Sequence, residues 1–183
     1  MGAVYEFDKE KMIIGVIYHD EEVFTKAMEI LRAEFGETDL ECEPFSFSEE
    51  FSSYYDGELG GEGQRRIFSF KETVDPSRQA AIKQRTNEIE KQFSIDGNRK
   101  INLDPGFINH GRLMLATTKN AGFRIPLADG IYTELTLFYA RGEWHKFPWS
   151  YRDYQSERVQ RFLTEVRNIY LAERRKTMKQ KSN

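Results

Sequence analysis

Residues 99–139 constrain the fold of this chain most, because they consist of strand-like segments in which polar and charged side chains alternate with apolar ones. Asn102, Asp104, Arg124 and Glu134 are among the interrupting residues. Successive side chains of a strand point to opposite faces of a sheet, so this pattern predicts a sheet with one polar, charged face. A rigid face that carries carboxylates and cations is suited to binding a ligand, although the pattern identifies no reaction.

The first hundred residues predict strands and helices in mixed order. Residues 12–18 form an apolar run typical of a buried strand, and Asp20 can cap a helix that Gly36 ends. Asp75 followed by Pro76 marks the start of a second helix. The other strands of this part are expected at residues 40–47, 65–70 and 100–103. The order strand, helix, strand, strand, helix, strand is typical of a ferredoxin-like split βαβ unit.

The second half of the chain predicts further strands and a long helix. The strands are expected at residues 112–118, 123–127, 131–139 and 143–147. An apolar stripe predicts a helix at residues 156–173 that packs on the sheet. Residues 174–183 are basic and lack this stripe, so we expect a frayed tail there. The fold class is therefore α+β, with residues 1–173 as a single domain. Its ferredoxin-like half is extended by antiparallel strands and closed by the C-terminal helix.

Length and charge restrict the partners of such a domain. The chain has 183 residues, enough for one sizeable core, and a formal net charge of −3. A net charge this small and negative does not attract nucleic acid, which would have to bind through a local basic patch. The longest apolar run is too short to span a bilayer, and no signal peptide precedes it. We expect a cytoplasmic protein without a nucleic-acid or membrane partner, whose oligomeric state the sequence leaves open.

Several common site motifs are missing from the sequence. No GxxxxGK[ST] loop is present, so a P-loop nucleotide site is not supported, and the acidic side chains in the glycine-rich residues 57–63 would repel phosphate. Arg65 and Arg66 follow this loop and could reach back over a ligand. Cys42 is the single cysteine, and the three histidines lack metal-binding spacing.

The run that contains Asn102 and Asp104 has two interpretations. Pro105 and Gly106 fit the second and third positions of a type II turn, which Asp104 would brace. Alternatively, Asn102 and Asp104 belong to a strand and point to the same face, where they can contact a ligand. The two interpretations do not exclude each other.

Cations and a second carboxylate follow along the chain. Thr118 ends a predicted strand, and Lys119 and Arg124 flank a short turn, where they could bind a phosphate or carboxylate group. A solvated loop is the alternative. Glu134 can pair across strands with Arg124. If Glu134 instead approaches Asp104, the two carboxylates could hold Mg²⁺ or share acid–base work.

Five motifs resemble an uncharacterised bacterial family, number 4416 among the domains of unknown function. They are NLDPG, LATTKN, RIPL-DGIYTELTL, YYDGELGG and WSYRDY, and they span nearly the whole chain in the family's order. The chain departs from the family's usual residues at Thr117, Asn120, Phe123, Pro126 and Arg152. The resemblance implies no established activity. It does imply candidate site residues, because these match recurring motif positions: Asn102, Asp104, Lys119, Arg124, Tyr132, Glu134 and Asp153.

The leading functional hypothesis is a site for a phosphorylated or nucleotide-like small molecule, in a binding protein or a metal-assisted enzyme. Asp104 and Glu134 are the expected catalytic groups or ligands of Mg²⁺. The expected ligand-binding residues are Asn102, Thr118, Lys119, Arg124, Tyr132 and Asp153. The alternative is a non-catalytic interaction module, which would grip a protein partner through Tyr54, Tyr55 and the aromatic residues 149–154.

Overall fold

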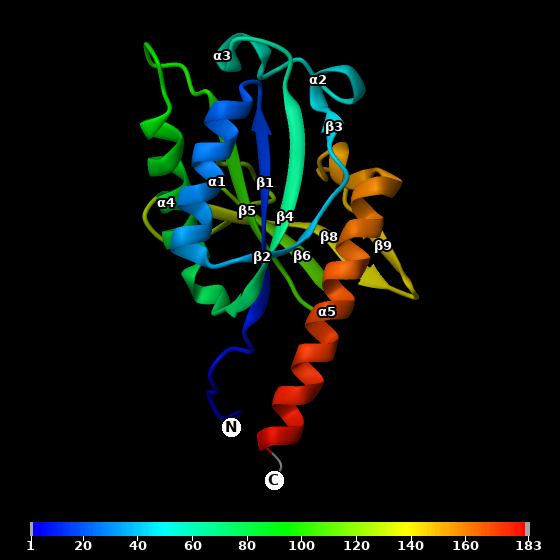
Figure 1. Cartoon of the computed structure of the whole chain (residues 1–183). Helices are drawn as coiled ribbons and strands as arrows, with labels where there is room; N and C mark the ends of the chain where they lie inside the picture. The colour runs from blue at the N-terminus through cyan, green and yellow to red at the C-terminus, as the bar shows by residue number, and fades with distance from the viewer. Residues whose placement is uncertain (1, 182–183) are drawn as a thin grey trace.

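The chain is organised around one antiparallel sheet with helices on both faces (Figure 1). The structure is a computed structural model and describes residues 2–181, with side chains up to residue 179. Within these residues the strands are β1 (Glu10–Tyr18), β2 (Thr38–Glu41), β3 (Phe45–Ser46), β4 (Gln64–Val74), β5 (Ile101–Ile108), β6 (Arg112–Thr117), β7 (Ile125–Pro126), β8 (Tyr132–Ala140) and β9 (Glu143–Lys146). The helices are α1 (Glu21–Phe35), α2 (Phe47–Glu50), α3 (Asp56–Leu59), α4 (Gln79–Gln92) and α5 (Glu157–Lys181), with short 3₁₀ turns η1 (Pro76–Arg78) and η2 (Asp153–Gln155).

The strand order explains why β1 is buried along its whole length. The sheet runs β2-β4-β1-β5-β6-β8-β7, while β3 pairs with β4 and β9 pairs with β8. β1 therefore lies in the interior between β4 and β5, and all nine of its residues are buried. Each pair of strands joined by a long helix, β1 with β2 and β4 with β5, is separated by one antiparallel strand.

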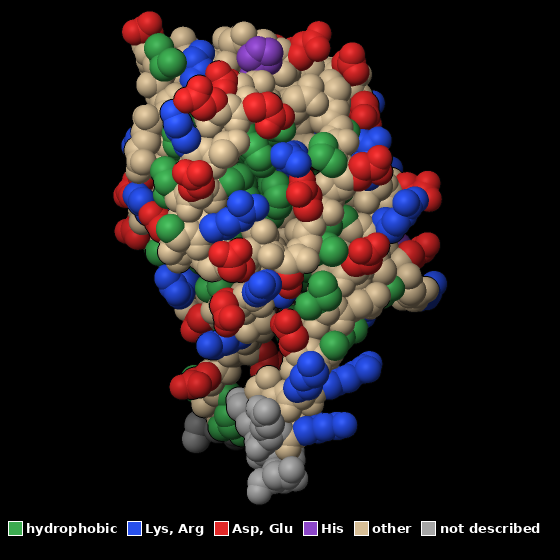
Figure 2. Space-filling view, viewed as in Figure 1, with side chains coloured by type: hydrophobic (Ala, Val, Ile, Leu, Met, Phe, Trp, Pro, Cys, Tyr) green, Lys and Arg blue, Asp and Glu red, His purple; other side chains and the backbone are tan. Residues whose placement is uncertain are grey.

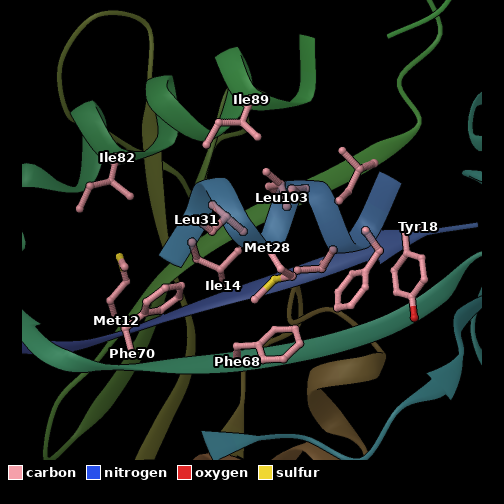
Figure 3. Close-up of a cluster of buried hydrophobic side chains, with 14 of the residues drawn as sticks. Met12, Ile14, Tyr18, Met28, Leu31, Phe68, Phe70, Ile82, Ile89 and Leu103 are labelled. Atoms are coloured by element: carbon pink, nitrogen blue, oxygen red, sulfur yellow. The ribbon is translucent and has the colours of Figure 1, made fainter. Parts of the chain in front are cut away.

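Alternation along β1 divides the core into two sides. Ile14 packs with Met28 of α1 and Ile89 of α4 on one face of the sheet (Figure 3). Ile13 points the other way, into a cluster that includes Leu163 of α5. Helices α1 and α4 thus share one face and α5 covers the opposite one. This confirms the α+β class, the large antiparallel sheet and the packed C-terminal helix, whereas the ferredoxin-like description stays a prediction.

Local signals place the helix ends as the sequence predicts. The Asp20 carboxylate accepts hydrogen bonds from the backbone N–H groups of Glu22 (2.7 Å) and Val23 (3.1 Å) at the start of α1. Gly36 ends this helix with a φ of 90°, a conformation that favours glycine. Asp75 accepts from the backbone N–H of Ser77 (2.8 Å) and begins the turn that leads into α4. Within the described residues, no helix combines the length and the apolar character of a membrane span.

The turn expected at Pro105 and Gly106 is wrong, because both residues lie inside β5. Pro105 pairs with Ile14 and Gly106 with Ile13 of β1. On its other side, β5 pairs with β6 only from Gly106 onward, so a residue without a backbone N–H is tolerated just before that point. The strand interpretation of Asn102 and Asp104 is the correct one.

Helix α5 is longer than the sequence indicates. It continues to Lys181, past the end expected at residue 173, and its last turns extend beyond the edge of the sheet (Figure 1). Lys and Arg side chains gather on this projecting end, whereas acidic and basic side chains alternate over the rest of the same face (Figure 2). Near the point where the helix leaves the sheet, Arg174 Nη2 lies 2.8 Å from Asp8 Oδ2.

We expect that removing residues 174–183 lowers the free energy of unfolding by less than about 1 kcal/mol. The Arg174–Asp8 pair that would be lost is exposed, and exposed ion pairs contribute about 0–1 kcal/mol. The truncation retains Glu173, whose Oε1 lies 3.5 Å from the buried Lys11 ammonium. Urea denaturation of the two chains measures the difference. A loss above about 2 kcal/mol would show that the projecting turns are docked, within one chain or between copies.

Candidate functional site

A fork between β5 and β6 creates the candidate site. The two strands pair only through Gly106, Phe107 and Ile108 of β5, while the end of β6 pairs with β8. At Gly106, an added Cβ would lie 2.5 Å from Leu115 Cδ2 and 2.8 Å from the Met114 carbonyl oxygen. Glycine is therefore needed where the strands touch. Beyond this point they separate, and a cavity opens between them beside α4.

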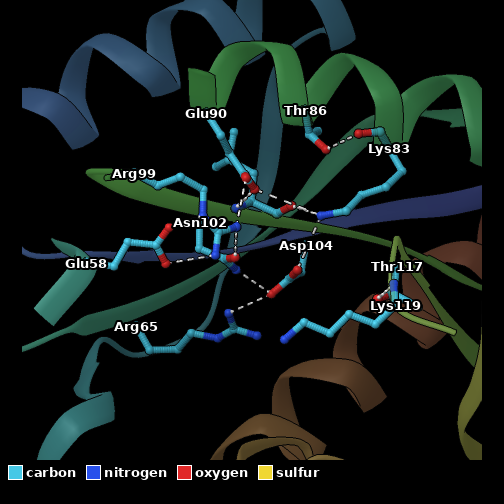
Figure 4. A network of polar contacts seen from close by, with 11 residues as sticks. Glu58, Arg65, Lys83, Thr86, Glu90, Arg99, Asn102, Asp104, Thr117 and Lys119 are labelled. Atoms are coloured by element: carbon cyan, nitrogen blue, oxygen red, sulfur yellow. Dashed lines mark hydrogen bonds and ion pairs between the residues drawn. The ribbon is translucent and has the colours of Figure 1, made fainter. Parts of the chain in front are cut away.

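The cavity has a volume of about 120 Å³ and is lined by charged side chains from distant parts of the chain. Arg65 comes from β4, Lys83 from α4, Asp104 from β5, Lys119 from the segment after β6, and Asp153 from η2. Figure 4 shows the first four of these converging on one region. The sequence separation of these residues means that only the assembled sheet brings them together.

Arg65 forms the buried floor of the site, with 2% of the residue exposed. Its Nη2 donates to Tyr154 Oη (3.2 Å) and lies 3.1 Å from Asp153 Oδ2. Among the described residues, its Nε and Nη1 have no hydrogen-bond acceptor. Burial raises the pKa of Asp153 even though Arg65 acts in the opposite direction. The guanidinium therefore compensates a buried carboxylate, while Nε has no acceptor and Nη1 has only a long ion-pair contact, 3.6 Å from Asp104 Oδ2.

Asp104 lies between two cations. Asn102 Nδ2 donates to Asp104 Oδ2 (2.7 Å), Lys83 Nζ lies 3.5 Å from Oδ1, and Arg65 Nη1 lies 3.6 Å from Oδ2. Burial acts to raise the pKa of Asp104, but Lys83 and Arg65 outweigh it, so the pKa lies below its ordinary value. Asp104 is thus held as a carboxylate, at distances from both cations that are long for direct ion pairs.

A polar network joins this floor to α3 at the top of the sheet (Figure 4). Arg99 donates to Glu58 of α3 (2.7 and 2.9 Å), to Glu90 of α4 (3.0 Å) and to Asn102 Oδ1 (3.0 Å). Glu90 in turn accepts from the backbone N–H of Leu103 (2.7 Å). The Asn102 side chain therefore accepts a hydrogen bond from Arg99 through Oδ1 and donates one to Asp104 through Nδ2.

Lys119 is the cation of the cavity whose side chain is not engaged by a carboxylate. In the described part of the chain, its Nζ forms neither an ion pair nor a hydrogen bond and lies 5.2 Å from the centroid of the Tyr54 ring. Figure 4 shows the side chain extending toward Arg65 and Asp104. The Lys119 backbone N–H donates to Thr117 Oγ1 (3.2 Å), which orders the start of this segment.

The structure brings five of the eight predicted site residues together. The residues that line the cavity are Asn102, Asp104, Thr118, Lys119 and Asp153. Arg124, Glu134 and Tyr132 do not line it. Arg124 Nε lies 2.8 Å from Glu134 Oε2, which confirms the salt bridge expected between them. Arg124 also donates to the Lys119 carbonyl oxygen (2.7 Å) and to Tyr151 Oη (3.0 Å), so it braces the cavity wall.

Glu134 and Tyr132 both lie on β8, outside the cavity lining. Glu134 is 1% exposed, and burial raises its pKa although Arg124 acts to lower it. Tyr132 is half-buried and pairs with Thr117 of β6 and Pro126 of β7. The charge of Asp104 also acts to raise the pKa of Glu134, and the shared metal site of these two carboxylates stays a prediction. Among the described residues, no group of three or more His, Cys, Asp or Glu side chains could hold a metal ion.

Lys83 and Arg99 are site residues that the sequence interpretation missed, and Arg65 was noted only as able to reach a ligand. A signal for Lys83 exists in α4, where Lys83, Thr86 and Glu90 are buried polar residues at helical spacing beside the apolar stripe. No comparable local signal separates Arg65 from Arg66. Arg66 points to the opposite face, where its Nε lies 2.7 Å from Glu41 Oε1.

Comparison with known proteins identifies a family but no activity. No curated protein matches the chain, and no solved structure matches it. A family model does match, over residues 8–170, and this range includes the strands and helices that build the cavity. The chain belongs to the family described as a domain of unknown function, DUF4416.

Proposed function

We propose that this protein binds a phosphorylated small molecule in the cavity between β5 and β6, with Arg65 and Lys119 holding the phosphate. One observation carries the proposal. Both side chains line the same cavity. Among the described residues the Lys119 ammonium and the Arg65 Nε lack acceptors, and the Arg65 Nη1 has only a long contact to Asp104.

The buried Arg65 donors favour a ligand that supplies oxygen atoms. A buried donor without a partner costs about 1–3 kcal/mol, and more when the group is charged, whereas the exposed Lys119 carries no such cost. Phosphate oxygens accept several charge-assisted hydrogen bonds at once, from the planar fork of arginine and the point charge of lysine. The long distances from Asp104 to Lys83 and Arg65 indicate that Asp104 does not fully occupy either cation.

Binding is better supported than acid–base chemistry by Asp104 and Glu134. The lowered pKa of Asp104 makes it a weak base near neutral pH, since Lys83 and Arg65 stabilise the charged form. Glu134 is occupied by Arg124 and lies outside the cavity lining. The cytoplasmic location and the lack of a nucleic-acid partner stay predictions.

A protein-interaction module is the second candidate function. Tyr54 is 70% exposed and Tyr151 is 40% exposed, and both lie near the cavity, where a partner could contact them. Trp149 is used within the chain instead. It stacks between Phe123 and Phe147, with ring centroids 4.8 and 5.0 Å away, and its indole N–H donates to the Leu135 carbonyl oxygen (2.9 Å).

Lys119→Ala should abolish stabilisation of the protein by phosphate compounds while leaving the unliganded protein folded. Lys119 is exposed and makes no ion pair within the described residues, so its removal should change the free energy of unfolding by no more than about 0.5 kcal/mol. Thermal unfolding is followed with and without phosphorylated ligands. A ligand at one hundred times its Kd stabilises the parent by about 2.7 kcal/mol.

Lys91→Ala is the matched control, because it removes the same charge from an exposed position of α4 away from the cavity. It should respond to ligands like the parent. If the parent itself responds to no phosphate compound, the ligand proposal is refuted, and the interaction module becomes the better account. If both lysine variants lose the response equally, general charge rather than the cavity is responsible.

A further inference from the structure

We infer that the ligand is a compact phosphate monoester that carries hydroxyl groups, such as a sugar phosphate, rather than a nucleotide or a simple carboxylate. This inference rests on the proposed function. It is based on three further properties of the same cavity, namely the charge of its lining, its size and its unused neutral polar groups.

The charged donors that the lining leaves free suit one phosphate monoester. Arg99 is paired with Glu58 and Glu90, and Asp104 and Asp153 lie against Lys83 and Arg65. Among the described residues, the Lys119 ammonium and the Arg65 Nε remain without an acceptor. A phosphate monoester carries a charge of about −1.5 to −2 at pH 7 and offers several acceptor oxygens. A di- or triphosphate would bring more negative charge than these two donors can compensate.

The size of the cavity restricts the group that it can enclose. Its volume of about 120 Å³ is comparable to the ~150 Å³ of a cavity that holds benzene. Sites for drug-sized molecules usually occupy about 300–1,000 Å³. The enclosed space therefore accommodates a phosphate group and a few attached atoms. A purine or pyrimidine on the same phosphate would have to lie outside it.

Neutral hydrogen-bonding groups line the rest of the cavity. Asn87 of α4, Thr118 after β6 and Tyr55 before α3 all line it, and no described residue forms a hydrogen bond with their side chains. Burial raises the pKa of the Tyr55 hydroxyl, so it stays protonated and can both donate and accept. Amide and hydroxyl groups of this kind pair with the hydroxyls of a polyol. These groups would add little to the affinity for inorganic phosphate, which the cations bind without them.

Isothermal titration calorimetry at fixed pH and ionic strength tests the inference with four probes, which are ribose 5-phosphate, ribose, inorganic phosphate and AMP. Ribose 5-phosphate should bind at least about tenfold more tightly than either inorganic phosphate or AMP, which corresponds to about 1.4 kcal/mol. Ribose alone should show no binding. AMP contains the same ribose 5-phosphate with adenine in place of the anomeric hydroxyl, so this comparison tests whether the cavity disfavours a base at that position.

Asn87→Ala separates recognition of the hydroxyls from recognition of the phosphate. The substitution should lower the affinity for ribose 5-phosphate about five- to tenfold, which is the effect of one lost hydrogen bond. It should change the affinity for inorganic phosphate less than twofold. Asn168→Ala, at an exposed position of α5 away from the cavity, is the control and should change neither affinity.

The outcomes distinguish this inference from the proposed function. If AMP binds more tightly than ribose 5-phosphate, or if inorganic phosphate binds as tightly, the inference is overturned while a phosphate site remains. Equal losses for both probes in Asn87→Ala would also overturn it, because Asn87 would then act on the phosphate or on the fold. If none of the four probes binds, both the inference and the proposed function fail.

Discussion

Arg65→Met should lower the free energy of unfolding by about 3–5 kcal/mol at pH 7, the usual cost of removing one partner of a buried ion pair. Asp153 is 4% exposed and would lose the guanidinium that lies 3.1 Å from it. Tyr154, itself buried, would lose the donor to its hydroxyl oxygen. Urea denaturation measures the loss. Arg66→Met is the control on the same strand, where the lost ion pair to Glu41 is partly exposed and should cost about 1 kcal/mol or less.

The cost of Arg65→Met should shrink as the pH falls. Burial already raises the pKa of Asp153 in the folded protein, and loss of Arg65 removes the main opposing influence. Asp153 of the folded variant then holds its proton over a pH range in which the unfolded chain has already lost it. Across this range the free energy of unfolding of the variant falls as the pH rises. The difference between parent and variant should therefore be larger at pH 7 than at pH 5. An equal difference at both values would contradict an unpaired Asp153 as the cause.

Gly15→Ala should destabilise the protein by about 1–3 kcal/mol, the usual cost of adding an atom to a packed interior. Gly15 lies on β1 directly beneath the Arg65 guanidinium. A Cβ at this position would lie 2.6 Å from Arg65 Nη2 and 2.9 Å from Cζ. The guanidinium could retreat only by leaving Asp153 and Tyr154.

A double-mutant cycle tests whether Arg65 is the cause of this cost. Because methionine is flexible and ends in a methyl group, it can adjust to the added Cβ. Gly15→Ala should then cost less than about 0.5 kcal/mol in the Arg65→Met background, and the two changes should be strongly non-additive. Additive losses would indicate that the alanine disturbs β1 itself rather than the space for Arg65.

Much of the fold could be predicted because its signals are local. The apolar run that became β1, the caps Asp20 and Asp75 and the terminating Gly36 each act over a few residues. The Arg124–Glu134 pair was also predictable, since only a short turn and β7 separate the two residues. The turn predicted at Pro105 failed because local propensity favoured it, whereas pairing with β1 decided the outcome.

What the sequence determined by itself was the set of buried strands, the positions of the main helix starts and the polar face that contains Asn102 and Asp104. Only the tertiary structure decided that this face becomes a cavity. Its depth comes from the separation of β5 and β6 beyond Gly106, and its charge from residues such as Arg65, whose hydrogen-bond partner Tyr154 is 89 residues away. Alternation along a strand specifies which side chains share a face. It does not specify which strands diverge or which distant cation lies against them, because those depend on how the complete sheet and its helices pack.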